Sequence, residues 1–243
     1  YLDERHLDWA WGAQGPRRNF MSFYSLKYDK LFDDFDNKAI NTTDDWTLAT
    51  GGTAGVFART ADKNTIIRGS WGTTAATSGL HLLYPLDWMY GDYLCGIQCR
   101  FRTSNITAKR IEIGITSTQP AVNTNLVNSL TTPTFNTTAN GAVYAYDETG
   151  GTTTTGLFTI GTSITAAKTT WTTNRPVAAT WQVVRLEIWT NRVKCWVDGV
   201  LLANLTEGTT DYIEGGTAAQ FSLTSKSGDT NDGNLDVDYV LQW

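Results

Sequence analysis

The sequence predicts an all-β protein, an antiparallel two-sheet β-sandwich with an extended N-terminal arm. Three observations predict this fold class. Residues 181–202 alternate apolar and polar side chains twice across a turn, patterns with a helical period are nearly absent, and the composition is rich in Thr, Gly and aromatic residues. Alternation of this kind gives each strand one buried face and one polar face.

The chain of 243 residues divides into two parts of different character. Residues 28–243 are predicted to form one sandwich domain, because no linker, charge block or change of composition interrupts them. Residues 1–27 are rich in aromatic side chains, contain Gly12, Gly15 and Pro16, and have no core of their own. We therefore predict an arm that docks onto a partner. Its predicted docking residues are aromatic or basic: Trp9, Trp11, Arg17, Arg18, Phe20, Phe23 and Tyr24.

Short alternating segments bounded by turn residues predict the strands of the domain in chain order. The pattern is strong at 109–117, where Ile111, Ile113 and Ile115 are expected to point into the core. The predicted strands are 31–36, 46–50, 55–60, 64–70, 79–84, 92–103, 109–117, 141–147, 156–160, 181–190, 192–198, 200–203, 219–225 and 234–242.

Polar segments at 118–140, 150–155 and 162–174, which are rich in Thr, are predicted to be loops. Loops of this kind in a compact domain are usually functional or are held by a partner.

Two tight turns, at Thr190-Asn191 and Asp198-Gly199, connect the strands of residues 181–202. Trp189 and Trp196 then project from the polar faces of adjacent strands, and we expect them to be cross-strand neighbours. Such a pair is suited to stacking on the faces of sugars. The alternative is that most of the ten tryptophans fill the interior of the sandwich.

Several segments resemble the concanavalin A-like lectin and glucanase superfamily. They are the strand that follows Trp181, the Val197-Asp198-Gly199 turn, Leu31–Phe35 with Asp45-Trp46, and Leu235–Val240. The resemblance implies a jelly roll in which the first and last strands lie close together.

The W-x-x-V-x-L-E-I-W strand and the Thr-rich loops also resemble lectin-like virion proteins of tailed phages. That resemblance implies a capsid decoration or a tail-associated adhesin on the virion surface. Its partners would be other virion proteins, such as a capsid or tail protein. It would form a homo-oligomer, with a trimer as the form that the analogy suggests.

Three functions are compatible with these observations: a non-catalytic virion structural protein docked by its arm, a carbohydrate-binding lectin or adhesin, and a glycoside hydrolase or polysaccharide lyase. Retaining glucanases of the superfamily carry an E-x-D-x-E strand, which this sequence lacks. Two pairs of acids remain. Asp236 and Asp238 share a face of the predicted closing strand, whereas Glu112 and Glu187 either meet across a sheet or pair with nearby arginines on an outer face. We predict that the protein is not an enzyme.

The segment 227–236 is rich in oxygen-bearing side chains. It has two interpretations, a calcium site, or an Asp/Asn/Gly turn between the last two strands, which is the commoner use of such a sequence. The calcium ligands would be Asp229, Asn231, Asp232 and Asp236. No other cofactor is predicted.

A net charge of -5 without a basic cluster argues against nucleic-acid binding, and no apolar run is long enough to predict a membrane span. The three cysteines do not describe a disulfide framework. Cys95 and Cys99 lie on one strand, too far apart to bridge each other, while a link from either to Cys195 across the sandwich stays open.

Overall fold

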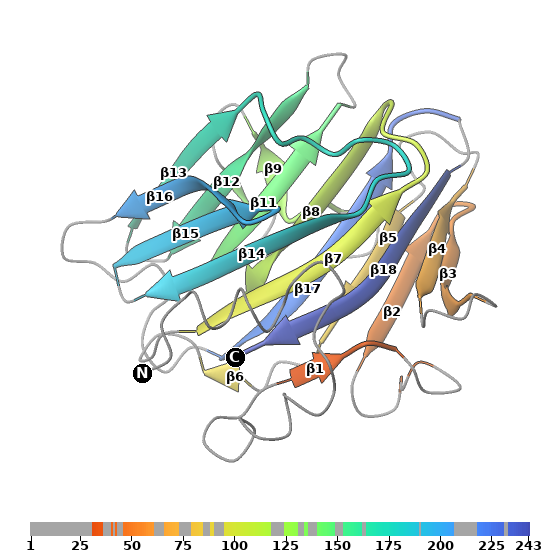
Figure 1. Ribbon diagram of the computed structural model, residues 1–243, viewed down its shortest axis with the longest axis horizontal. Helices are drawn as coiled ribbons and strands as arrows, with labels where there is room; N and C mark the ends of the chain where they lie inside the picture. Colours follow the sequence, from red (N-terminus) through yellow and green to blue (C-terminus); the bar gives the residue numbers. More distant parts are fainter. Residues whose placement is uncertain are drawn as a thin grey trace.

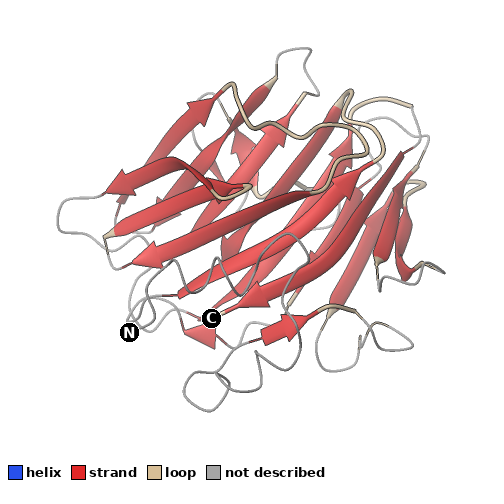
Figure 2. Ribbon diagram, in the orientation of Figure 1, coloured by secondary structure: helices blue, strands red, loops and turns tan. Residues whose placement is uncertain are grey.

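The computed structural model describes residues 31–35, 40, 42, 46–60, 66–72, 79–84, 88–89, 95–117, 124–130, 134–135, 140–148, 153–161, 164–189, 191–206, 218–230 and 233–243. Within these ranges every regular element is a β-strand, and no helix able to cross a bilayer occurs (Figure 2). The predicted all-β class is confirmed. The arm at residues 1–27, with its docking residues, and its boundary with the domain lie outside the described ranges and stay predictions.

Two antiparallel sheets lie face to face and form a sandwich (Figure 1). We call the sheet nearer the viewer in Figure 1 the front sheet and the other the back sheet. The front sheet contains, in spatial order, β16 (Val200–Thr206), β15 (Arg192–Val197), β14 (Gln182–Trp189), β7 (Cys95–Thr103), β18 (Gly233–Gln242), β4 (Ile67–Trp71) and β3 (Gly55–Arg59), and β1 (Leu31–Asp33) also pairs with β18.

Within the described residues the back sheet is built in the same way, with seven strands in its main order and one short strand that pairs outside this order. It contains, in spatial order, β13 (Ile164–Trp171), β12 (Thr154–Gly161), β11 (Gly141–Asp147), β8 (Lys109–Thr116), β17 (Ala218–Ser227), β5 (Gly79–Leu83) and β2 (Thr47–Gly51), and β6 (Trp88–Met89) also pairs with β17. Two short strands, β9 (Val127–Ser129) and β10 (Thr134–Phe135), form a separate pair.

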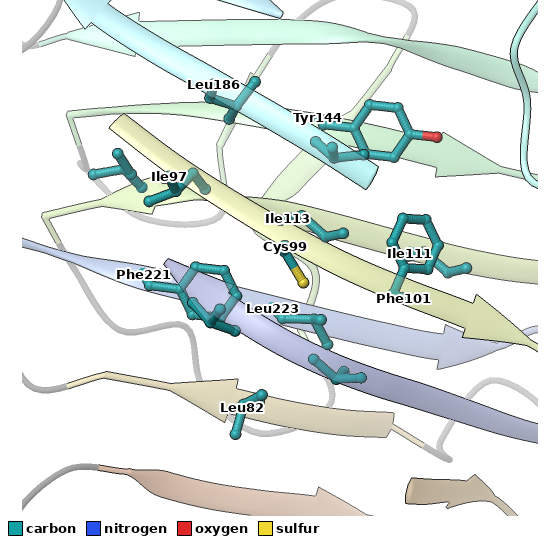
Figure 3. Packing of buried hydrophobic residues seen from close by; sticks show 14 of the residues in the cluster. Leu82, Ile97, Cys99, Phe101, Ile111, Ile113, Tyr144, Leu186, Phe221 and Leu223 are labelled. Carbon is teal, nitrogen blue, oxygen red and sulfur yellow. The ribbon is translucent and has the colours of Figure 1, made fainter. Parts of the chain in front are cut away.

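The core fills the space between the sheets (Figure 3). Ile97 and Phe101 of β7 enter it from the front sheet, and Ile111, Ile113 and Ile115 of β8 enter it from the back sheet, as predicted. All five side chains are at most 1% exposed. Because burying a large apolar side chain stabilises the fold by about 1.5–3 kcal/mol, this cluster is a major source of stability.

The first and last strands are neighbours, as the resemblance to the jelly roll implied. Leu31 pairs with Gln242, and Asp33 pairs with Val240. The first and last strands of the described residues, β1 and β18, therefore lie side by side in the front sheet (Figure 1).

One segment differs from its predicted structure. Residues 162–174 were expected to form a Thr-rich loop, but residues 164–171 form β13, an edge strand of the back sheet. Thr is β-branched and has a high preference for strands, so a Thr-rich run fits an exposed edge as well as a loop. The predicted loop at 118–140 likewise contains β9 and β10.

All three cysteines are free and buried on the front sheet. Cys95 and Cys99 lie on β7, and Cys195 lies on β15, with β14 between the two strands. A disulfide across the sandwich is therefore ruled out for these residues, because they share a sheet. Burial raises the pKa of each thiol far above its ordinary value.

Candidate functional site

A row of alternating tryptophan and basic side chains crosses the outer face of the front sheet. The row is Trp189, Lys194, Trp196, Arg185 and Trp243. The Lys194 ammonium lies 5.7 Å from the ring centroid of Trp189 and 5.5 Å from that of Trp196. The Arg185 guanidinium lies 5.2 Å from Trp196 and 5.5 Å from Trp243. Each cation is thus within cation–π range of two rings, and we call this set the tryptophan–cation row.

The alternation of β14 and β15 places these side chains on one face. Val184, Leu186 and Ile188 point into the core, so the residues between them point outward. Arg185 pairs with Trp196 and Trp189 pairs with Arg192, because β14 and β15 are joined by a two-residue connection. The predicted two-sided hairpin is confirmed.

A second tight turn fixes the other end of β15. Asp198 and Gly199 have φ values of 51° and 79°, the left-handed conformation of both central residues in a type I′ turn. The Asp198 carboxylate accepts a hydrogen bond of 2.8 Å from the Val183 N–H, and the Asp198 N–H donates to the Val183 carbonyl over 2.9 Å. The turn therefore ties the end of β15 to the start of β14.

Trp243 reaches the row because Gly96 leaves room for its ring. A methyl group at Gly96 would lie 2.5 Å from the Trp243 ring. The backbones of the two residues exchange hydrogen bonds of 2.9 and 3.1 Å. Trp243 is thus held beside Gly96 of β7, with its ring next to Arg185.

Trp181 forms a second aromatic contact on this outer face. The guanidinium groups of Arg100 and Arg102 lie 4.8 and 4.6 Å from its ring centroid. Both arginines are also paired with acids of β18: Arg100 with Asp238 and Arg102 with Asp236, each over 2.6 Å.

Asp236 is the most strongly engaged acid of this face. Its side chain is 4% exposed and binds both Arg68 and Arg102 over 2.6 Å. Burial alone would raise the pKa of this carboxyl, but the hydrogen bonds and charges of the two arginines outweigh burial and hold the pKa below its ordinary value. The carboxylate is therefore ionised and neutralised from two sides.

The outer face of the front sheet carries more basic than acidic side chains. Among its described residues, six basic side chains oppose three acidic ones. They are Arg68, Arg100, Arg102, Arg185, Arg192 and Lys194 against Glu187, Asp236 and Asp238. This excess is opposite in sign to the net charge of -5 for the whole chain.

The outer face of the back sheet carries a buried ion-pair network instead. Glu112, which is 0% exposed, binds Arg110 over 2.6 Å and accepts a 3.0 Å hydrogen bond from the Thr224 hydroxyl. Arg110 also binds Asp147 over 3.0 Å. The backbone N–H of Leu126 donates a hydrogen bond to the Glu112 carboxylate. Residues 124–130 therefore cover this network on the outer face of the back sheet.

Those covering residues form a small second core on the back sheet. Leu126, Val127 and Leu130 pack against Val143 and Phe158, which point away from the main core. The chain itself therefore fills the outer face of the back sheet at β8, β11 and β12.

The positions of the acids exclude the pairing considered for hydrolysis. Glu112 lies on the outer face of the back sheet and Glu187 on the outer face of the front sheet, so the idea that they meet across a sheet is wrong. Each binds an arginine of its own strand, Arg110 and Arg185 respectively, which confirms the alternative interpretation.

Of the four predicted calcium ligands, the structure describes two, Asp229 and Asp236. Asp229 accepts a 2.6 Å hydrogen bond from the buried Lys109 ammonium, and Asp236 binds two arginines. Asn231 and Asp232 lie outside the described residues, so the site stays a prediction. The two described carboxylates are each neutralised by basic side chains of this chain.

The predicted ligand-binding tryptophans do lie on one outer face. Trp189 is 40% exposed and Trp196 is partly exposed. They are not direct partners across the hairpin, because the Glu187–Lys194 pair lies between them in the register. The sequence alone did not identify Trp243 or the basic side chains between the rings as part of the site. The alternation along Arg192–Trp196 nevertheless places Lys194 on the same face as Trp196.

Comparison with known proteins identifies the fold. No protein-family model matches the sequence, and no curated protein matches it either. Among solved structures, the carbohydrate recognition domain of Emp47p has a TM-score of 0.57 at 12% identity, covering 88% of this chain and 94% of that one. The β-glucanase of Bacillus licheniformis has a TM-score of 0.55 at 12% identity, covering 89% and 98%.

A LamA variant from Zobellia galactanivorans, solved with laminaritriose and laminaritetraose, has a TM-score of 0.56 at 12% identity, covering 87% of this chain and 97% of that one. At these identities the likeness concerns the fold alone. Lectin-type domains and glucanases are both present among the neighbours. The described sandwich has the concanavalin A-like jelly-roll fold that these lectin domains and glucanases share.

Proposed function

We propose that this chain is a non-catalytic carbohydrate-binding domain and that the tryptophan–cation row binds the saccharide. The observation that carries the proposal is the placement of Trp189, Trp196 and Trp243 on one outer face, held in line by Lys194 and Arg185. Aromatic rings that are fixed by neighbours bind a ligand at a low cost in conformational entropy. The exposed parts of such rings suit contact with the apolar faces of sugar units.

The state of the acids supports binding without hydrolysis. Retaining hydrolysis needs two carboxyl groups about 5 Å apart across the glycosidic bond, one of them able to donate a proton. In the described part of the chain Glu112 is buried under residues 124–130, and Asp236 is ionised between two arginines. Neither is placed to transfer a proton to a bound saccharide.

Binding by immobilised polysaccharides tests the proposal. We expect the full chain to be retarded in gels that contain a recognised polysaccharide, and the double variant Trp189→Ala, Trp196→Ala to migrate freely. Val56→Ala is a matched control, because Val56 is an exposed apolar residue of the distant edge strand β3. Release of reducing ends from a polysaccharide by the purified full chain would show an enzyme and refute the proposal.

We further propose that the domain is carried on a virion, as a capsid decoration or a tail-associated protein. The support is the sequence resemblance and the aromatic arm at residues 1–27. Virion partners, a homo-oligomer such as a trimer, and a virion-surface location belong to this proposal. Deletion of residues 1–27 should abolish co-sedimentation with particles while saccharide binding persists, and sedimentation equilibrium measures the oligomer. Co-sedimentation without the arm would refute arm-mediated docking.

A further inference from the structure

We propose that the ligand of the tryptophan–cation row is an anionic saccharide, one that carries carboxylate or sulfate groups. The inference rests on the proposed function and specifies its ligand class. Its basis is a local excess of positive charge, at Arg192 and Lys194, beside two partly exposed tryptophan rings.

Most basic side chains of the outer face are already neutralised. Arg185 binds Glu187, and Arg100 binds Asp238. Arg68 and Arg102 both bind Asp236. These pairs hold side chains in place and leave little net charge for a ligand.

Arg192 and Lys194 differ from these neighbours. Neither forms an ion pair with any part of the chain that the structure describes, and the Nε of Arg192 is buried without a hydrogen-bond partner. Both project from β15 on the side of Trp189 and Trp196, and both are partly exposed. Two positive charges therefore remain uncompensated where the rings are accessible.

The chemistry of these two groups suits an acidic sugar. A guanidinium presents parallel N–H donors to a carboxylate or sulfate, and an ammonium is a compact charge with three donors. Lys194 is oriented by the rings on either side of it, so little side-chain freedom is lost on binding. Stacking would hold the sugar while the cations select its acidic groups.

A nucleic acid is a less suitable ligand for this face. Single-stranded nucleic acids also bind aromatic rings and basic side chains, but they need a continuous basic track along the backbone. Here the uncompensated cations are Arg192 and Lys194, and Glu187 lies directly opposite Lys194 in the register. The whole chain is acidic, with a net charge of -5.

Titration calorimetry of the full chain tests the ligand class. The probes are polygalacturonate, dextran sulfate, uncharged dextran, a neutral β-glucan and oligothymidylate. We expect binding to polygalacturonate or dextran sulfate at least about 10-fold tighter than to the neutral polymers, and weaker binding at higher salt because exposed charges are screened. The comparison between the two acidic polymers distinguishes carboxylate from sulfate recognition.

The double variant Arg192→Gln, Lys194→Gln should lose about 10-fold or more in affinity for the acidic polymer and most of its salt dependence. Lys226→Gln on β17 of the back sheet is the matched control, since it removes a positive charge from the other sheet. Trp189→Ala should weaken binding while the salt dependence persists. Circular dichroism and thermal midpoints establish that each variant folds, and the single variant Lys194→Gln replaces the double variant if the double variant does not fold.

The outcomes separate the ligand class from the function. Equal binding of neutral and acidic polymers, unchanged in the double variant, would overturn the anionic ligand and leave the carbohydrate-binding function standing. Tighter binding of oligothymidylate would overturn it in favour of a nucleic acid. If none of the saccharide probes binds, both proposals are refuted.

Discussion

Glu112 holds a covering segment onto the back sheet through a single buried carboxylate. It binds Arg110 and Thr224 and accepts a backbone hydrogen bond from Leu126. A charge this deeply buried is tolerated because each of its acceptor positions is used. The same group would be costly if one of these donors were removed.

Glu112→Gln is therefore expected to lower the free energy of unfolding by about 3 kcal/mol, because it removes one of the two carboxylates that the buried Arg110 binds in the described part of the chain. Urea denaturation followed by tryptophan fluorescence measures the loss. Asp238→Asn is the control, since the Arg100–Asp238 pair is partly exposed and should contribute at most about 1 kcal/mol. Equal losses in the two variants would contradict the buried role of Glu112.

The sequence predicts part of the residue-scale picture. The two-residue period places Trp189 and Trp196 on an outward face, and the structure agrees. It does not predict that Arg68 binds Asp236, because 168 residues separate them along the chain. The sequence likewise does not predict that Trp243 belongs to the site. Its position depends on the bulge in β18 and on the close approach of its ring to Gly96.

At the scale of single elements, turn chemistry and strand edges decide the structure. The Asp198-Gly199 turn is predictable because its residues tolerate positive φ. The edge strand β13 is not, because an exposed Thr-rich edge has no apolar period that distinguishes it from a loop.

Gly199→Ala tests the turn that positions β15. A methyl group here would contact nothing within 4 Å, so the entire effect comes from the φ of 79°. We expect a loss of about 1 kcal/mol in the free energy of unfolding, measured by urea denaturation. A neutral or stabilising result would show that the hairpin takes another turn type in solution.

His81 gives β5 a pH-dependent stability. Its side chain is 1% exposed, and burial lowers its pKa to about 4, although a hydrogen bond with the Thr124 backbone acts in the opposite direction. Between pH 6.5 and 4 the unfolded chain therefore binds a proton that the folded protein excludes. The contribution of His81 to stability is complete above pH 6.5 and falls as the pH drops toward 4, by up to about 3 kcal/mol.

The free energy of unfolding should therefore decrease from pH 7 to pH 4.5, and the decrease should be smaller in His81→Gln. Urea titrations at several pH values measure both slopes. His6→Gln is the matched control, because the chain has two histidines and His6 belongs to the predicted arm. An unchanged slope in His81→Gln would mean that the folded protein protonates His81 as readily as the unfolded chain does.

For the whole molecule, the sandwich and its two layers are predictable from composition and period, whereas the strand order is not. Alternation assigns a buried face to each strand but does not say which strand lies beside it. The resemblance to known jelly rolls supplied the adjacency of β1 and β18, and the register confirms it.

The buried thiols report on this whole structure. Cys95 is 5% exposed and Cys99 and Cys195 are 0% exposed, and burial raises the pKa of all three. Because only a thiolate reacts readily, we expect an aromatic disulfide reagent to label the three thiols together, and only as the protein unfolds globally. Rapid labelling of one thiol under native conditions would reveal a local opening of the front sheet.

The order of strands also determines when the two sheets can form during translation. The last two strands of the described residues, β17 and β18, occupy interior positions of the back and front sheets respectively. During translation neither sheet can complete its strand pairing until β17 and β18 leave the exit tunnel, so the strands on either side of them keep unpaired edges until then. Nascent chains that lack β17 and β18 should consequently depend on chaperones.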